Sequence, residues 1–82
     1  MITLTLYYRP YCHLCHEMIA QLERAQQSWP FELSLIDIDD SDELEARFAL
    51  LIPILMAGET PLFHYHYSAQ KLRDFLAQHD AN

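Results

Sequence analysis

Two cysteines, Cys12 and Cys15, stand at the point where the hydrophobic period of the sequence changes. Residues 2–8, before them, alternate apolar and polar side chains, which predicts a β-strand. After Pro10, apolar residues recur at gaps of three and four, which predicts one face of a helix that ends before Pro30. That face consists of Cys15, Met18, Ile19, Leu22, Ala25 and Trp29. The pattern constrains the chain to place its C-x-x-C motif at the junction between a strand and the helix that follows.

The second predicted strand comprises residues 31–38. An acidic segment, residues 37–45, begins at its end. It leads into a short helix that we expect to run to about Ala49, with Asp40 as the N-cap and Glu43 reaching back from position N3. Because negative charge suits the start of a helix, we interpret these acids as the solvated beginning of that helix. The alternative is that residues 37–45 form the contact face of a non-catalytic interaction domain.

The last part of the chain predicts a hairpin and a helix. Residues 53–57 and 62–67 are expected to be strands joined by a tight loop at Gly58, and Ser68 is expected to cap the final helix. The residues of this helix expected to point inward are Leu72, Phe75 and Leu76. The fourth strand is expected to bury Phe63, Tyr65 and Tyr67 and to expose His64 and His66.

The predicted elements follow one another in the order β-α-β-α-β-β-α. We expect the first two strands, which a helix connects, to be parallel with a right-handed crossover, and the last two to form a hairpin. The predicted fold class is α/β, with three layers, α/β/α, around a four-stranded mixed sheet. The first and last helices are expected on one face and the middle helix on the other. Residues 1–82 are expected to form a single domain, since the chain has room for one core.

The balance of charges limits the classes of partner. Five basic and twelve acidic residues give a formal charge of −7, which argues against nucleic acid and membrane surfaces and disfavours attraction of glutathione, itself an anion. The first residues lack the basic segment of a signal peptide, and no apolar segment is long enough to span a bilayer. We therefore expect a cytoplasmic protein. In the cytosol a C-x-x-C motif is more often catalytic or metal-binding than structural.

The position of Cys12 at the start of a helix predicts a reactive thiol. The first N–H groups of a helix have no partners within the helix and carry a partial positive charge, so they stabilise a thiolate placed there. Cys15 lies one turn further on the buried face, from which it can attack a mixed disulfide formed at Cys12. Arg9 is expected to steady the thiolate or an anionic substrate, and Tyr11 to provide an apolar docking surface beside it.

The residues alone leave other uses of the cysteines open. One alternative is a pair of buried, inert thiols. Another is a zinc or iron–sulfur site with His13 and His16, although the spacing does not supply a full set of four ligands. The segment from Cys12 to His16 also matches C-x-x-C-H, the attachment pattern of c-type haem, which requires export and a second axial ligand such as Met56. We expect no resident metal.

Pro53 begins the third predicted strand. This strand should run antiparallel to the first, so its start is expected near the end of the first strand, next to Cys12. The fourth strand ends at the same edge, which brings Tyr67 and Ser68 into the neighbourhood. Ile52, Pro53, Tyr67 and Ser68 are therefore candidate substrate-binding residues.

Residues 6–15, Leu-Tyr-Tyr-Arg-Pro-Tyr-Cys-His-Leu-Cys, and residues 52–55, Ile-Pro-Ile-Leu, resemble the glutaredoxin-like branch of the thioredoxin superfamily. The likeness is greatest to small bacterial members with a C-H-L-C centre and covers nearly the whole chain. It implies the thioredoxin fold and thiol–disulfide exchange, with Cys12 as the nucleophile and Cys15 as the resolving thiol.

The same resemblance implies a cis bond between Ile52 and Pro53 that turns the N–H and C=O of Ile52 towards an extended substrate. It further implies, as substrate, a disulfide-containing protein or a low-molecular-weight thiol. A reductase or glutathione would be the electron donor. A monomer without a bound cofactor is expected.

Three departures from the glutaredoxin pattern bear on glutathione. His13-Leu14 stands between the cysteines in place of Pro-Tyr, and Leu51-Ile52 precedes the proline in place of Thr-Val. Residues 66–69, His-Tyr-Ser-Ala, replace the glycine pair that admits the glutathione backbone. This bulk and the negative charge both argue against glutathione binding.

Overall fold

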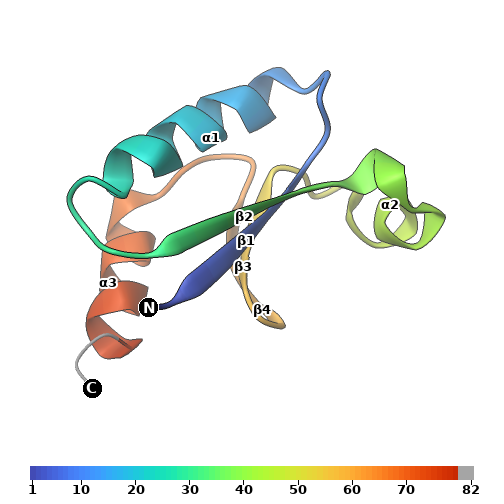
Figure 1. Ribbon diagram of the computed structural model, residues 1–82. Helices are drawn as coiled ribbons and strands as arrows, with labels where there is room; N and C mark the ends of the chain where they lie inside the picture. Colours follow the sequence, from blue (N-terminus) through green and yellow to red (C-terminus); the bar gives the residue numbers. More distant parts are fainter. Residues whose placement is uncertain (80–82) are drawn as a thin grey trace.

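The computed structural model describes residues 1–79. Its elements are β1 (Thr3–Tyr8), α1 (His13–Ala25), β2 (Glu32–Asp37), the 3₁₀ turn η1 (Ile38–Asp40), α2 (Asp42–Phe48), β3 (Ile54–Ala57), β4 (Thr60–His64) and α3 (Ala69–His79). The predicted order is confirmed, with η1 as an additional short turn (Figure 1). None of the helices in residues 1–79 is both long enough and apolar enough to cross a bilayer.

The four strands form one mixed sheet in the order β2-β1-β3-β4. Strands β1 and β2 are parallel and connected through α1, whereas β3 is antiparallel to both β1 and β4. Tyr7 of β1 lies opposite Ile54 of β3, so the start of β3 lies beside the end of β1. This register brings the chain just before β3 to the edge of the sheet from which the C-x-x-C motif emerges.

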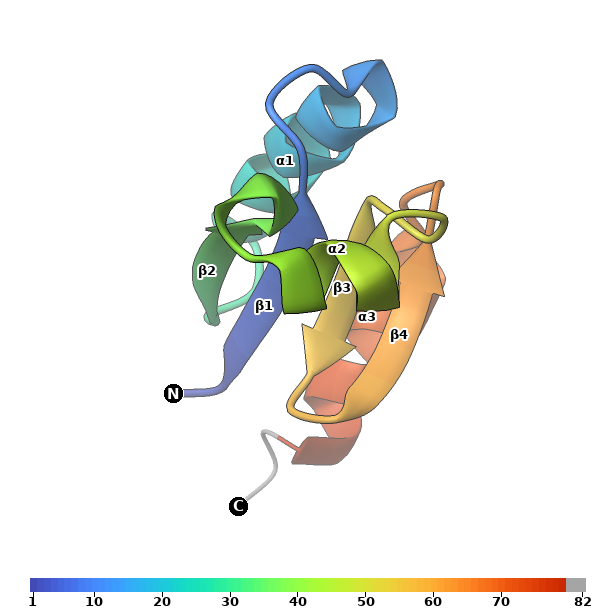
Figure 2. The ribbon, with the colours of Figure 1, turned by 90° about the vertical axis from the view of Figure 1, so that its right-hand side faces the viewer.

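Helices cover both faces of the sheet, as predicted. Helices α1 and α3 lie on one face and α2 on the other (Figures 1 and 2). The large core, on the α1 and α3 face, consists of Leu4, Leu6, Met18, Leu22, Ala25, Phe31, Leu55, Phe63, Leu72 and Leu76. The small core, beneath α2, consists of Ile38, Phe48, Ile54 and Met56. Strand β3 serves both cores because successive side chains of a strand point to opposite faces.

The start of α2 differs from the prediction. The N-cap is Ser41, whose hydroxyl accepts a hydrogen bond from the N–H of Leu44 at 3.3 Å. The predicted cap, Asp40, belongs instead to η1, which Asp37 caps by accepting the N–H of Asp39 at 2.9 Å. Because η1 is inserted before α2, the helix begins one residue later than predicted. The sequence offers several possible capping residues in succession and does not show which one is used.

Strand β4 is shorter than the predicted strand, residues 62–67, and begins two residues earlier in the chain. It ends at His64, and Tyr65 has a φ of 67°, a left-handed conformation that no strand continues. Tyr65 is consequently exposed rather than buried, which corrects the prediction, while Phe63 is buried and Tyr67 half-buried. Alternation through residue 67 predicted one long strand, but the backbone turns at Tyr65.

Hydrogen bonds define the end of α1 and the start of α3. Helix α1 ends at Ala25, four residues before the predicted end of its apolar stripe at Trp29, and the N–H of Trp29 bonds the carbonyl of Ala25 at 2.9 Å. Ser68 caps α3 as predicted, because its hydroxyl accepts the N–H of Lys71 at 3.2 Å. Leu72 and Leu76 of α3 are buried and Phe75 is half-buried against the large core.

Candidate active site

Cys12 is the N-cap residue of α1, where the sequence predicted it. Its backbone is extended, and its Sγ accepts a hydrogen bond from the N–H of Cys15 at 3.1 Å. In most helices a hydroxyl or carboxylate oxygen caps this position. Here a half-buried sulfur takes that place, so the first turn of α1 directs an N–H donor at the atom that would carry negative charge in a thiolate.

Cys15 is fully buried in the first turn of α1. Burial raises the pKa of its thiol to about 12, and the hydrogen bond to Cys12 adds to the increase. The backbone and positive charge of Arg9 act in the opposite direction but do not outweigh burial. The two thiols are free and differ in environment, one accessible and one shielded. A close pair of this kind is compatible with a redox function.

The loop before Cys12 is attached to α1 at two points. The N–H of Cys12 bonds the carbonyl of Arg9 at 3.1 Å, and Nε2 of His16 lies 2.6 Å from the carbonyl of Pro10. In the sequence analysis His16 enters only as a possible metal or haem ligand, and its contact to Pro10 was missed. The spacing in the sequence could have indicated this contact. His16 follows Cys12 by four residues and so lies on the same side of the helix as the loop that carries Pro10.

Arg9, a predicted site residue, is held by the acidic segment. Its guanidinium lies 2.9 Å from Asp39 and 3.4 Å from Glu45, and these carboxylates raise the pKa of Arg9. The sequence indicated that Arg9 would face the thiolate or an anionic substrate, and that role stays a prediction. What the structure adds is a link between the cysteine loop and the α2 side of the sheet.

The bond between Ile52 and Pro53 is cis, as the resemblance implied, and Pro53 is buried. The N–H of Ile52 does not turn outward, however, because it donates to the carbonyl of Phe48 at 3.1 Å. The prediction that this N–H pairs with a substrate is therefore wrong for this conformation. The end of α2 uses the donor, and a role for the Ile52 carbonyl stays a prediction.

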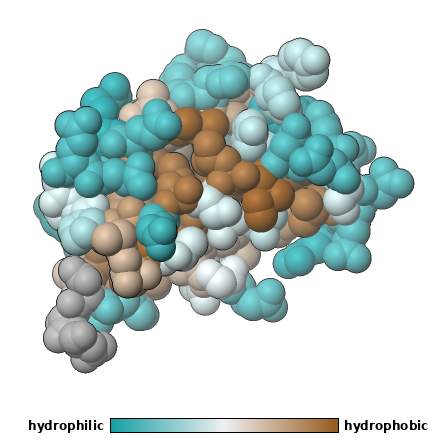
Figure 3. All heavy atoms as spheres, in the orientation of Figure 1, coloured by the Kyte–Doolittle hydropathy of each residue, from teal (hydrophilic) through white to brown (hydrophobic). Residues whose placement is uncertain are grey.

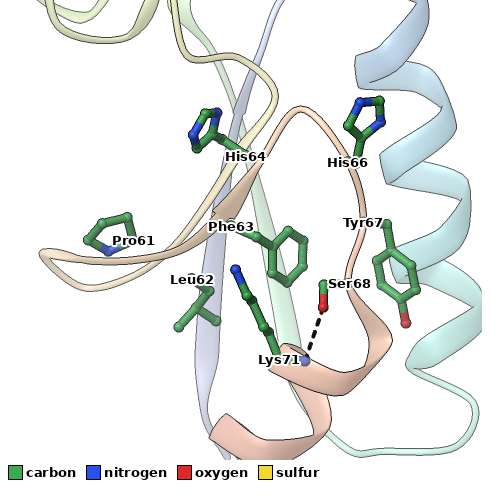
Figure 4. A pocket seen from close by; sticks show the side chains of 8 residues that line it. All are labelled: Pro61, Leu62, Phe63, His64, His66, Tyr67, Ser68 and Lys71. Carbon is green, nitrogen blue, oxygen red and sulfur yellow. Dashed lines mark hydrogen bonds between the residues drawn. The ribbon is translucent and has the colours of Figure 1, made fainter.

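Tyr11 is 93% exposed at the tip of the cysteine loop, which suits the docking surface predicted for it. Tyr67 and Ser68 line a pocket of about 500 Å³ between β4 and the start of α3 (Figure 4). His64, His66 and Lys71 line the same pocket, and burial raises the pKa of Tyr67. All the lining residues come from positions 61–71, so this pocket does not include the cysteines. A substrate-binding role for Tyr67 and Ser68 stays a prediction.

The histidines beside the cysteines have other partners. Nε2 of His13 lies 2.7 Å from a carboxylate oxygen of Glu17, one turn along α1. In residues 1–79 no three side chains of His, Cys, Asp or Glu are grouped so that they could hold a metal ion. The zinc and iron–sulfur alternative therefore gains no support from the arrangement of these residues.

Comparison with known proteins gives the context of this geometry. Residues 3–77 match the family described as Glutaredoxin-like domain (DUF836). The chain is 34% identical to protein Ne2328 from Nitrosomonas europaea, with a TM-score of 0.79 over 90% of this chain and 89% of that one. It is 31% identical to protein XcR50 from X. campestris, with a TM-score of 0.73 over 92% and 96%.

More distant likeness extends to the thioredoxins. The thioredoxin of Fasciola hepatica superimposes with a TM-score of 0.61 at 15% identity, over 95% of this chain and 80% of that one, which shows the fold alone. A comparison of the sequence with curated proteins found no match. With residues 3–77 matched by one family and both cysteines at the start of α1, the chain belongs to the glutaredoxin-like domain family and has the thioredoxin fold.

Proposed function

We propose that the protein is a thiol–disulfide oxidoreductase in which Cys12 is the nucleophile and Cys15 the resolving thiol. The observation that carries this proposal is the asymmetry of the pair. The Sγ of Cys12 accepts an N–H from the first turn of α1, and the Cys15 thiol lies fully buried one turn behind it. Exchange chemistry needs one accessible sulfur that is stabilised as a thiolate and one that is kept from competing for the substrate.

The reaction proceeds in two substitutions at sulfur. The Cys12 thiolate attacks a substrate disulfide, so that a new S–S bond forms to Cys12, the substrate S–S bond breaks, and the first substrate sulfur leaves and takes up a proton. Cys15 then loses its proton and attacks the Sγ of Cys12, which releases the second substrate thiol. The protein ends with a Cys12–Cys15 disulfide, and two electrons have passed to the substrate.

The environment of Cys15 suits the second substitution. Part of the increase in its pKa comes from the hydrogen bond to Cys12 and from the charge on that sulfur. The contribution of charge disappears once Cys12 is bonded to a substrate, since a disulfide sulfur carries no charge, and a hydrogen bond to that sulfur becomes weaker. The Cys15 thiol therefore becomes easier to deprotonate in the intermediate in which it must react.

The finer assignments are proposals of the same kind. A disulfide-containing protein, or a low-molecular-weight disulfide, would be the substrate, and a reductase or glutathione would return electrons in the cytoplasm. The side chains of His66 and Tyr67 and the net charge of −7 argue against glutathione as the preferred donor. The opposite direction of electron flow, from a substrate dithiol to the protein, uses the same atoms.

A thiol titration of the purified protein against redox buffers, scored by alkylation of Cys12 and Cys15, tests the proposal. We expect one reversible two-electron transition between about −270 and −200 mV. Cys12→Ser should abolish reduction of a small disulfide, and Cys15→Ser should accumulate the mixed disulfide as a mass adduct. Full turnover by Cys12→Ser, or the absence of any transition, would refute the proposal.

A further inference from the structure

Most of the exposed large apolar side chains lie in three segments: the start of α1 with the loop before it, the loop before β3 and the loop after β4. Of the seven exposed ones in the described chain, five form the set that we call the apolar collar: Tyr11, Leu14, Leu50, Leu51 and Tyr65. Tyr11 and Leu14 flank Cys12 on the α1 side. The other three belong to the loops before β3 and after β4. Leu50 is 85% exposed, which leaves its side chain without a packing role in the isolated chain.

The fold brings the two halves of the apolar collar to one end of the molecule. Tyr7 of β1 pairs with Ile54 of β3, so the loop before β3 leaves the sheet where the cysteine loop leaves β1. Figure 2 shows the start of α1, the loop between α2 and β3, and the loop between β4 and α3 all towards the upper end of the sheet. Clustering of apolar side chains beside a reactive group is typical of a surface that binds a partner.

Tyr65 holds the second half of the apolar collar in place. Its hydroxyl donates to the carbonyl of Leu50, and its N–H donates to the carbonyl of Pro53 at 2.8 Å. Its φ of 67° is unfavourable for a side chain of this size and persists only where neighbouring contacts compensate. A loop fixed in this way loses less conformational freedom when a partner binds.

Negative charge next to the apolar collar indicates what charge a partner should carry. The acidic segment, residues 37–45, approaches the cysteine loop through the pairs of Arg9 with Asp39 and Glu45. Those two carboxylates neutralise Arg9, and the remaining acids leave this side negative, as is the whole chain at −7. Such a field attracts cationic partners and repels anionic ones such as glutathione.

We propose that the apolar collar docks an apolar segment, with positive charge nearby, that flanks a disulfide in a protein substrate. The inference rests on the proposed function, because the partner must reach Cys12 and the apolar collar at once. It names the substrate class of that site as protein disulfides in apolar, basic surroundings.

The experiment uses single-turnover reduction of mixed disulfides that release 2-thiopyridone. Three short peptides carry the reactive cysteine flanked by Leu and Lys, by Leu and Glu, or by Ser and Lys, and 2-hydroxyethyl 2-pyridyl disulfide is the small reference. The measured quantity is the ratio of each peptide's rate to that of the reference. We expect the Leu–Lys peptide to exceed the Ser–Lys peptide about tenfold, which is the effect of partly burying one leucine side chain. Its advantage over the Leu–Glu peptide should be a few-fold at low salt and should shrink as salt rises.

Leu50→Ser tests the apolar collar directly, and an exposed leucine elsewhere provides the matched control. Apolar surface also gathers between α1 and α2 across the face seen in Figure 3. The control residue is Leu35 of the edge strand β2, which is 43% exposed. Leu50→Ser should lower the Leu–Lys ratio about fivefold to tenfold, whereas Leu35→Ser should not lower it. Tyr65→Phe, which keeps the ring and removes the hydroxyl, should produce a smaller decrease.

The outcomes separate the two proposals. If the wild-type protein reduces neither the peptides nor the small reference, the proposed oxidoreductase function fails. If it reduces them all but the ratios are equal for wild type, Leu50→Ser and Leu35→Ser, the docking proposal fails and the function stands. Equal rates for the Leu–Lys and Leu–Glu peptides at low salt would overturn the part of the proposal that concerns charge.

Discussion

On one face of the sheet, α1 and α3 bury ten residues against β1, β3 and β4, whereas on the other face α2 and η1 share a core of four. The cysteine pair belongs to the deeper side, since Cys15 is fully buried in the first turn of α1. The loop that carries Leu50 and Pro53 follows directly from α2, on the thinner side. The candidate site thus combines a deeply buried Cys15 thiol on the side of the large core with a loop before β3 that follows the smaller core.

Packing that differs between the two faces allows one small fold to combine a rigid cysteine pair with an adaptable loop. The proposed exchange requires Cys12 and Cys15 to keep their relative position, and a deep core restrains it. A docking loop benefits from some freedom to accommodate different partners, and a segment with few buried contacts opens at lower free energy than the rest of the molecule. Hydrogen bonds from Tyr65 limit that freedom at Leu50 and Pro53.

The largest effect should come from a cavity in the deeper core. Leu22 of α1 is fully buried among residues of the large core, so Leu22→Ala leaves a void that helix and sheet on both sides cannot easily close. We expect a loss of about 4 kcal/mol in the free energy of unfolding, measured by urea denaturation. Hydrogen exchange should accelerate throughout the molecule. A loss below about 1 kcal/mol would contradict the view that this face determines global stability.

The layers, the strand order and the position of Cys12 could be predicted because each depends on local periodicity and on short connections. The cap at Ser41 could not, because Asp37, Asp40, Ser41 and Asp42 are all capable of capping, and only the formation of η1 selects among them. The turn at Tyr65 was missed for a similar reason. Two carbonyls from a distant loop, those of Leu50 and Pro53, hold it against its own preference for an extended backbone.

The candidate site was predicted less completely than the fold. Both thiols follow from the C-x-x-C spacing and the helix start, but the partners of Arg9 depend on how the acidic segment folds back, which spacing does not encode. The cis bond before Pro53 came from family resemblance and not from local sequence. The hydrogen bond from the N–H of Ile52 to the carbonyl of Phe48 forms only if α2 ends at the right residue. Helix ends are the least predictable part of a helix.

A matched cavity on the thinner side should have a smaller effect. Ile38 is also fully buried, but it belongs to the small core of η1, α2 and β3. For Ile38→Ala we expect a loss of about 2 kcal/mol, because a shallow site can collapse into the space that is left. Hydrogen exchange should accelerate in α2 and in the loop to β3 before it does in α1. Equal losses for Ile38→Ala and Leu22→Ala would mean that the two faces are equally rigid.

The smallest effect concerns Cys15 and the pH dependence of stability. Its pKa is about 12 in the folded protein, raised first by burial, against an ordinary value of 9.0. Between these two values the unfolded chain has lost the thiol proton while the folded chain retains it. The unfolded state therefore binds fewer protons, and stability must fall as pH rises through this window. The contribution is fully present below pH 9 and is lost progressively towards pH 12.

Over the first part of that window, from about pH 9 to 10, one such thiol should reduce the free energy of unfolding by about 1 kcal/mol. Cys15→Ala lacks the group but retains every other titrating side chain, including Tyr67, whose pKa is also raised. Urea denaturation of both proteins under reducing conditions isolates the thiol as the difference between their two pH profiles. We expect the stability of the wild type to fall more steeply than that of Cys15→Ala. Parallel profiles would mean that Cys15 ionises as readily in the folded protein as in the unfolded chain, and the asymmetry on which the proposed order of attack depends would be lost.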